Sequence, residues 1–253
     1  MDLVSPVQKT TAVREINSNK SQNKPLSGAP VETKTVVRSS SLSSVETQSF
    51  VVSNGLYTAT ISNKNGGSFS KFVFEKYSKH DSSNVNIIDH YNSNNLLLDF
   101  VSLDGDKVSL DDNWDVVGSY YNVDATSKQK SVTFKTVYND FVIKKRLTFY
   151  PNTYKIGLDV IFDQPDRFIS RAQYHLVWPG GLPPTEKNLK DDYTHFQGYA
   201  YLGDELLDPS AKADSPNEEK QTGNTRWTAT KTKYFIAAII PEDVGVGAVV
   251  TGR

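Results

Sequence analysis

Short segments in which apolar and polar residues alternate, separated by pairs of turn residues, follow one another from Phe50 onward, and this spacing constrains the fold most strongly. One strand about every 8 to 12 residues with short turns is typical of an antiparallel sandwich rather than of βαβ units. The chain is therefore expected to be all-β with little helix. Strands are predicted at 56–61, 69–77, 96–103, 107–110, 131–138, 141–150, 154–162, 171–178 and, around His195, at 193–201.

The turns between these segments carry residues that accept positive φ angles. Asn65-Gly66-Gly67, Asp104-Gly105 and Asn139-Asp140 each stand between two alternating segments, as expected for hairpins. Within the predicted strand 141–150, period-two alternation places Lys145 on the same face as three apolar side chains. These are Ile143, Leu147 and Phe149.

The amino-terminal part of the chain differs in composition from the rest. Residues 1–48 are rich in Ser, Thr, Asn, Gln and Lys, and no aromatic residue precedes Phe50. Such a segment buries too little apolar surface to offset its ordering entropy, so it is predicted to be a disordered linker. A short strand at 34–37 is the alternative. Residues 49–253 are predicted to form one β domain, with loops at 179–192 and 203–224 and a helical turn near 204–207.

Composition excludes several classes of function. The formal net charge of −1 gives no global electrostatic reason to bind nucleic acid. The absence of cysteine excludes disulfides, thiolate zinc sites and thiol nucleophiles. No apolar run approaches the roughly 20 residues of a membrane-spanning helix. The low mean hydropathy of −0.48 is compatible with a folded core because 12 Phe, 13 Tyr and 3 Trp supply large side chains.

Residues suited to catalysis or metal binding are scattered, and no catalytic, cofactor or metal site is predicted. The histidines form no closely spaced pair, and adjacent carboxylates on a strand point to opposite faces. Asp104-Gly105-Asp106 lacks the remaining ligand positions of a calcium loop. Phosphate-binding and nucleophile-elbow motifs are absent. The residues considered are His80, His90, His175 and His195, with the acidic pairs at 111–112, 191–192 and 218–219.

Aromatic residues form the main candidate binding surface. In an all-β chain such residues belong to the core or form a platform that stacks a sugar or grips an extended peptide. A groove between sheets, or an edge strand open to an added strand, would provide the binding mode. The residues are Tyr120, Tyr121, Trp178, Tyr193, Phe196, Tyr199 and Tyr201.

The segment 223–241 is the most specific stretch of the sequence. Gly223 interrupts a polar loop, Trp227 is a large apolar anchor, and Pro241 ends an apolar run from Tyr234 to Ile240. A short continuous apolar run is typical of a strand buried on both faces. No residue in the run is a plausible nucleophile or acid, so the run is interpreted as packing.

Three segments together resemble the large periplasmic domain of YidC-type membrane protein insertases. The first is the segment just described, and the second runs from 50 to 62 and leads into Gly66-Gly67. The third, at 195–201, reads His-Phe-Gln-Gly-Tyr-Ala-Tyr. They occur in the family's order. The first segment matches at Gly223, Trp227, Tyr234, Phe235, Ala238, Ile240 and Pro241.

The resemblance implies an antiparallel β-supersandwich similar to mutarotase-like domains, on the periplasmic side of the inner membrane of a Gram-negative bacterium. A transmembrane helix would precede Met1, with residues 1–48 as its tether. The family's insertase activity belongs to a membrane core of five helices, and the family continues with further strands beyond Arg253. This chain is therefore expected to be a fragment with an exposed sheet edge.

The function implied is that of a non-catalytic domain that assists insertion and folding, in the manner of a chaperone, through contacts with Sec translocon components or nascent membrane proteins. The alternative is a carbohydrate-binding or mutarotase-like protein, which would need an acid and a base such as His175 and Glu186 in one cleft. A structural or adhesive surface domain is a third possibility. The candidate binding or family-motif residues are Trp178, Tyr199, Tyr201, Gly223, Trp227, Tyr234, Phe235 and Pro241.

Overall fold

The computed structural model describes residues 9–15, 36–38, 45–118, 122–209 and 217–252. Most of the linker expected at 1–48 lies outside these ranges, but two segments within it are strands, β1 (Lys9–Glu15) and β2 (Val36–Arg38). β2 overlaps the alternative strand considered at 34–37, whereas β1 was not predicted. The expected domain boundary at residue 49 stays a prediction.

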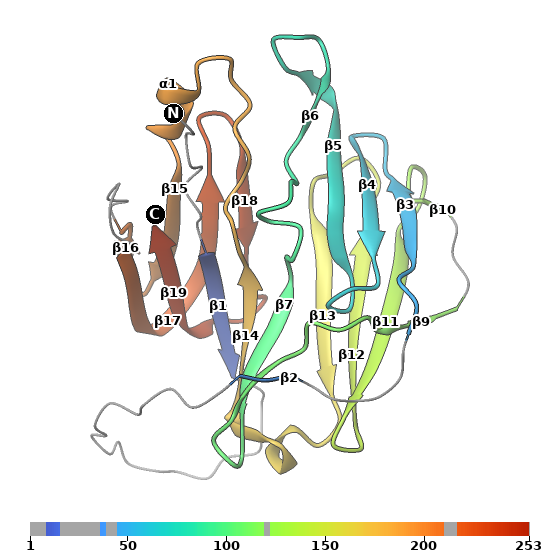
Figure 1. Cartoon of the computed structure of the whole chain (residues 1–253), viewed down its shortest axis with the longest axis vertical. Helices are drawn as coiled ribbons and strands as arrows, with labels where there is room; N and C mark the ends of the chain where they lie inside the picture. Colours follow the sequence, from blue (N-terminus) through green and yellow to red (C-terminus); the bar gives the residue numbers. More distant parts are fainter. Residues whose placement is uncertain (1–8, 16–35, 39–44, 119–121, 210–216, 253) are drawn as a thin grey trace.

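The largest of three sheets has ten strands (Figure 1). Its pairs are antiparallel except β2–β8. β18 (Ile236–Ile239) pairs with β17 off the main path. The order is β16 (Glu205–Leu207), β15 (Gln197–Leu202), β17 (Asn217–Lys231), β19 (Gly245–Gly252), β1, β14 (Ile169–Trp178), β7 (Leu97–Ser102), β8 (Lys107–Ser109) and β2.

Two smaller sheets complete the fold. One has the order β10 (Asn122–Asp124), β3 (Ser49–Ser53), β4 (Tyr57–Ser62), β5 (Ser68–Ser78) and β6 (Asn84–Asn86). The other has the order β13 (Ile156–Phe162), β12 (Phe141–Phe149), β11 (Lys130–Tyr138) and β9 (Asp115–Val117). A 3₁₀ turn (Pro165–Arg167) and the helix α1 (Leu189–Tyr193) lie in connections. Across the described ranges, no helix is both long and apolar enough to span a membrane.

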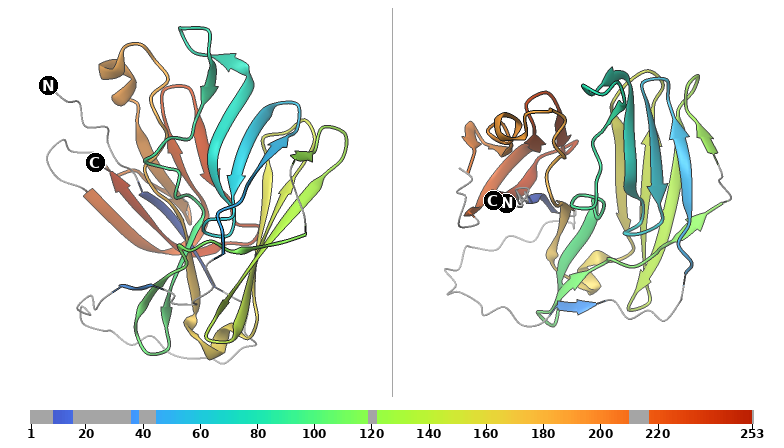
Figure 2. Two further views of the ribbon diagram at one scale, coloured as in Figure 1. Left: turned by 45° about the vertical axis from the view of Figure 1, so that its right-hand side comes forward. Right: turned by 45° about the horizontal axis from the view of Figure 1, so that its top comes forward.

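One apolar core is shared by the three sheets, and aromatic rings join them in pairs. Phe50 of β3 stacks on Phe134 of β11 at 6.0 Å between ring centroids. Phe100 of β7 meets Tyr138 of β11 edge-on at 5.2 Å. Figure 2 shows the large sheet on one side of the molecule and the two smaller sheets on the other. The expected all-β sandwich is confirmed.

The alternating segments predicted between 56 and 178 are strands, but three predictions further along the chain are wrong. Residues 217–224 belong to β17 rather than to a loop, because they pair with β19. Residues 205–207 form strand β16 instead of a helical turn. His195 lies in the turn between α1 and β15 and not within a strand.

Lys145 of β12 is fully buried in the core, on the same face as Ile143, Leu147 and Phe149 as predicted. Its Nζ donates hydrogen bonds to the backbone carbonyl oxygen of Asn65, at 2.7 Å, and to that of Leu96. It also lies 5.4 Å from the centre of the Trp114 ring. Lys145 therefore connects the middle of β12 to two turns that are distant from it in the sequence.

Burial lowers the pKa of Lys145 to about 7, because the low-dielectric core disfavours the charged form. A neutral amine has two N–H donors, which matches the two carbonyl acceptors on Asn65 and Leu96. Both acceptor residues have left-handed backbones, with φ of 56° and 55°. Lys145 thus provides hydrogen-bond donors for two backbone carbonyl oxygens that lie in turns and not in paired strands.

Buried asparagines complete the same region. Asn95 acts as a strand partner for Phe69, since its Nδ2 donates to the carbonyl oxygen and its Oδ1 accepts from the N–H, both at 2.8 Å. Asn63 Nδ2 donates to the carbonyl oxygens of Glu46 and Trp114 at 3.0 and 2.9 Å. Because unpaired buried backbone groups are costly, these side chains allow irregular segments to lie inside the core.

Lys145 makes the stability of the fold depend on pH. The unfolded chain keeps the lysine proton up to pH about 10.5, whereas the folded chain releases it near pH 7. Unfolding therefore takes up a proton within this window, and the free energy of unfolding should rise with pH by on the order of a few kcal/mol. Urea unfolding at intervals from pH 6.5 to 9.5 measures the rise.

Lys145→Met is the matched variant for this prediction. It should remove most of the rise, and at pH 9.5 it should be less stable than the parent by roughly 2 kcal/mol or more, because two buried carbonyls lose their donor. A parent protein whose stability is flat or falls over this pH range would contradict the account.

Gly66 provides a second test of the packing around Lys145. Its φ is +70°, and an added Cβ would lie 2.5 Å from the Trp114 ring, whereas Gly105 has φ +91° and nothing within 4 Å. Gly105→Ala should cost about 1–2 kcal/mol from backbone strain alone. Gly66→Ala should cost about 1–3 kcal/mol more, because the ring has to move. Equal losses in denaturant unfolding would show that the contact with Trp114 is not tight.

Candidate functional site

The register of β15, β17 and β18 places a set of mostly aromatic and apolar residues on one face of the large sheet. Tyr199 lies opposite Ala229, which lies opposite Ala238. Residues directly opposite in adjacent strands share a face. The same reasoning groups all members of this face, called the outer face below: Gln197, Tyr199, Tyr201, Trp227, Ala229, Lys231, Ile236 and Ala238.

The opposite face of β18 packs on the core. Ala237 and Ile239 lie against the main cluster, and Phe235 stacks on Phe74 of β5 at 5.2 Å with 15° between the ring planes. Tyr77 meets Phe235 edge-on at 5.8 Å. Phe235 is therefore a packing anchor, as the sequence indicated.

Exposure alternates strictly along the run that contains β18. Tyr234, Ile236 and Ile240 are 61%, 63% and 71% exposed and Ala238 is also exposed, whereas Phe235, Ala237 and Ile239 are partly buried. The prediction of a strand buried on both faces is therefore wrong. Because all positions of the run are apolar, its sequence does not show which face is covered.

Aromatic residues of the outer face are held by one another and by cations. Tyr201 and Trp227 stack at 5.9 Å with 13° between their planes, and the Arg226 guanidinium lies 5.7 Å from the Tyr201 ring. Lys231 Nζ lies 5.9 Å from the centre of the Tyr199 ring. These rings are only partly buried, so they form an ordered surface next to the exposed isoleucines.

The turn between β17 and β18 is attached to α1. Lys233 Nζ donates to Asp191 Oδ2 at 2.7 Å, and this hydrogen bond lowers the pKa of the Asp191 carboxyl below its usual range. The turn is closed by the N–H of Thr232, which donates to the carbonyl oxygen of Phe235 at 2.8 Å. The start of β18 is therefore fixed in place rather than free to swing.

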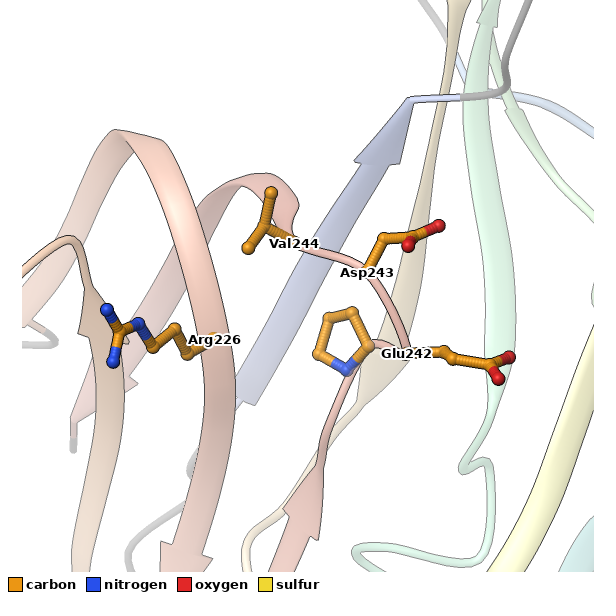
Figure 3. A pocket seen from close by; sticks show the side chains of 5 residues that line it. Arg226, Glu242, Asp243 and Val244 are labelled. Atoms are coloured by element: carbon orange, nitrogen blue, oxygen red, sulfur yellow. The ribbon is translucent and has the colours of Figure 1, made fainter.

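Pro241 lines a hollow of about 480 Å³ on the surface beyond the end of β18. Figure 3 shows Arg226 on β17 with its side chain directed away from Glu242, Asp243 and Val244, which come from the connection between β18 and β19. The lining combines charged side chains of both signs with Pro241 and Val244.

The remaining candidate residues lie elsewhere. Trp178 ends β14 and donates its Nε1–H to the carbonyl oxygen of Gly181 at 3.1 Å, so it closes a loop and is not part of the outer face. Gly223 lies at the bulge where the β17–β19 register shifts. Phe196 is buried, and its ring meets Tyr193 edge-on at 5.1 Å. Tyr120 and Tyr121 lie outside the described residues.

Groups that could support catalysis have arrangements that do not match a known constellation. His175 of β14 lies opposite Asp99 of β7, and Asp99 accepts a hydrogen bond from the Ser109 hydroxyl at 2.7 Å. A nucleophilic serine needs the imidazole, not the carboxylate, as the acceptor of its proton. The N–H of Glu186 donates to Asp192 at 3.1 Å in the loop before α1. Among the residues with described positions, no group of three or more His, Asp or Glu side chains is suited to hold a metal ion.

Several residues of this surface were missed from the sequence. Ile236 was interpreted as buried, and Arg226 and Lys231 were not considered. The available signal was the seven-residue apolar run, but a buried strand and a half-exposed edge strand give the same pattern. Only the strand pairing shows that, among the described strands, β18 has a partner on one side alone, which is β17.

Comparison with known proteins identifies relatives over most of the chain. The family model of the YidC periplasmic domain matches residues 49–252. Proteins named "Membrane protein insertase YidC" from Chlorobium luteolum and Chlorobium phaeovibrioides are 31% and 30% identical over 80% and 87% of this chain. A protein of the same name from Chlorobaculum parvum is 29% identical over 94% of the chain.

The matched regions are 35%, 38% and 41% of the lengths of these relatives, so the chain spans well under half of each. The match to the family model begins where β3 begins and ends where β19 ends. The match places the domain on the periplasmic side of the inner membrane. The chain therefore belongs to the YidC periplasmic domain family.

Proposed function

We propose that this domain is a non-catalytic module that assists the insertion and folding of inner-membrane proteins, through contacts with Sec translocon components or nascent membrane proteins. The observation that carries the proposal is the exposure of apolar side chains along β18 and beside it, Tyr234, Ile236 and Ile240. The solvent face of an antiparallel sheet is normally polar. Exposed contiguous apolar surface marks sites of interaction with other molecules.

Membership in the family supports the role of a module within a larger protein. The relatives are named for membrane protein insertion and are longer than this chain. The substrates of such a process are polypeptides with long apolar segments. A surface that combines partly buried aromatic rings with exposed isoleucines suits contacts with such segments.

The carbohydrate alternative has weaker support. Tyr201 and Trp227 could stack on a sugar ring, but Arg226 already lies over Tyr201. Sugar recognition also needs polar groups that converge on hydroxyls. The exposed isoleucines on the same side of the sheet, Ile236 and Ile240, offer no side-chain hydrogen bond.

Deletion of the domain tests the proposal. In the source bacterium, residues 49–252 of the chromosomal protein are replaced by a flexible linker, and insertion of newly made inner-membrane proteins is followed by pulse labelling and protease protection. Insertion of some of them should slow by a factor of about two to ten, the range expected when contacts worth roughly 0.4–1.4 kcal/mol are lost.

The control strain carries the intact protein with Leu103→Ser, which changes a 58% exposed apolar residue far from β18 in the sequence. Its insertion rates should equal those of the parent. Unchanged rates in the deletion strain, at equal protein level, would contradict the proposal and favour a structural or adhesive role.

A further inference from the structure

We infer that the free edge of β18 binds an extended apolar segment of an unfolded membrane protein as an added strand. The inference deepens the proposed function and rests on it. The proposed site is the edge of β18 that faces away from β17, together with the side chains of Tyr234, Ile236, Ala238 and Ile240. This set is called the apolar row below.

The backbone of β18 provides the first argument. Over the ranges that the structure describes, β18 pairs with β17 alone, from Ile236 opposite Lys231 to Ile239 opposite Thr228. The other edge of an edge strand presents N–H and C=O groups that can pair with a further strand. Such groups favour an extended polypeptide, whose own backbone can complete the ladder.

Side chains provide the second argument. The apolar row is exposed at all four positions, while the alternate residues face the core. A segment laid along the edge would place every second side chain beside this row. Covering one Ile side chain is worth roughly 1.5–3 kcal/mol, so contacts with Ile236 and Ile240 would add affinity to the backbone hydrogen bonds.

Rigidity provides the third argument. The ion pair between Lys233 and Asp191 fixes one end of β18, and Phe235 stacked on Phe74 anchors its inner face. A strand that is already ordered loses little conformational entropy when a partner binds. The edge is therefore a preformed template, and the incoming segment alone has to become ordered.

Charge around the row favours a polypeptide over a lipid surface. Attachment to an anionic bilayer requires a cluster of Lys and Arg without compensating acids. Here positively and negatively charged side chains are mixed. Two of the cations are paired with carboxylates, Lys233 with Asp191 and Arg226 with Asp204 at 3.8 Å. The charged residues around the row are Arg226, Lys231, Lys233, Asp191, Asp204, Glu242 and Asp243.

Peptide binding to the 253-residue chain tests the inference. The probe is a fluorescein-labelled peptide, Lys-Lys-Val-Thr-Val-Thr-Val-Thr-Lys-Lys, titrated by fluorescence anisotropy, with amide NMR shifts to locate the site. Saturable binding with Kd of roughly 10 μM to 1 mM is expected, the range of weak, small interfaces. Ile236→Ser should weaken it about tenfold, whereas Leu103→Ser should change it less than about twofold.

A second peptide, with the same sequence but with N-methyl groups on the three valines, tests the backbone pairing on unmodified protein. Of this peptide and a peptide methylated on the threonines, one should fail to bind and the other should still bind, because the direction of the added strand decides which of its edges faces β18, and methyl groups along that edge prevent the ladder. The comparison stays decisive even if Ile236→Ser impairs folding. Equal binding of the unmethylated and both methylated peptides would overturn the added-strand model.

Binding of a second copy of the chain or of a lipid surface to the apolar row would be a different outcome of these experiments. Absence of peptide binding at about 1 mM would overturn the inference, as would a dimer in sedimentation that Ile236→Ser abolishes, or Ile236-dependent binding to phosphatidylglycerol vesicles in its place. The deletion experiment distinguishes a failure of the edge site from a failure of the proposed function. Slow insertion without peptide binding refutes the edge site alone, whereas peptide binding with normal insertion in the deletion strain refutes the proposed function alone.

Discussion

The burial of Lys145 is the interaction on which the rest of the fold depends. A lysine amine in an apolar core is tolerable only when its donors are used, and here they are used by the carbonyls of Asn65 and Leu96. Those carbonyls belong to turns that precede β5 and β7, so one side chain on β12 connects all three sheets. Trp114 closes the space above the amine and leaves room only for glycine at position 66. The left-handed turns, the buried lysine and the tryptophan are therefore mutually dependent.

Packing is uneven across the molecule. The core around Lys145 holds most of the buried aromatic and branched residues, whereas the part of the large sheet formed by β15 and β19 has a small cluster of its own, Ala200, Leu202, Ala248 and Val250. β18 lies between the two regions, with one face on the main core and the other exposed. This division suits a contact module, because a rigid scaffold can present an incompletely covered strand without losing its own stability.

Much of the fold could be predicted from the sequence, because period-two alternation and glycine-rich turns are local signals. The strands between 56 and 178 and the inward direction of Lys145 followed from them. The acceptors of Lys145 could not be predicted, since they lie 80 and 49 residues away on irregular turns. The polar first half of β17 shows no alternation and is a strand only because β19 pairs with it. The exposure of Ile236 depends on which strands lie beside β18, which a uniformly apolar run does not encode.

Hydrogen exchange of the backbone amides tests most directly whether a rigid core carries a less stable, contact-forming extension. The account predicts that amides in the middle of β4, β11 and β12 exchange slowest, at the rate of global unfolding. Amides of β16, β18 and the first half of β17 should exchange faster by about two orders of magnitude or more, because each of these segments pairs with only one described strand and fewer contacts have to be broken for it to open. Uniform protection across all three sheets, with β18 as slow as β12, would contradict the account.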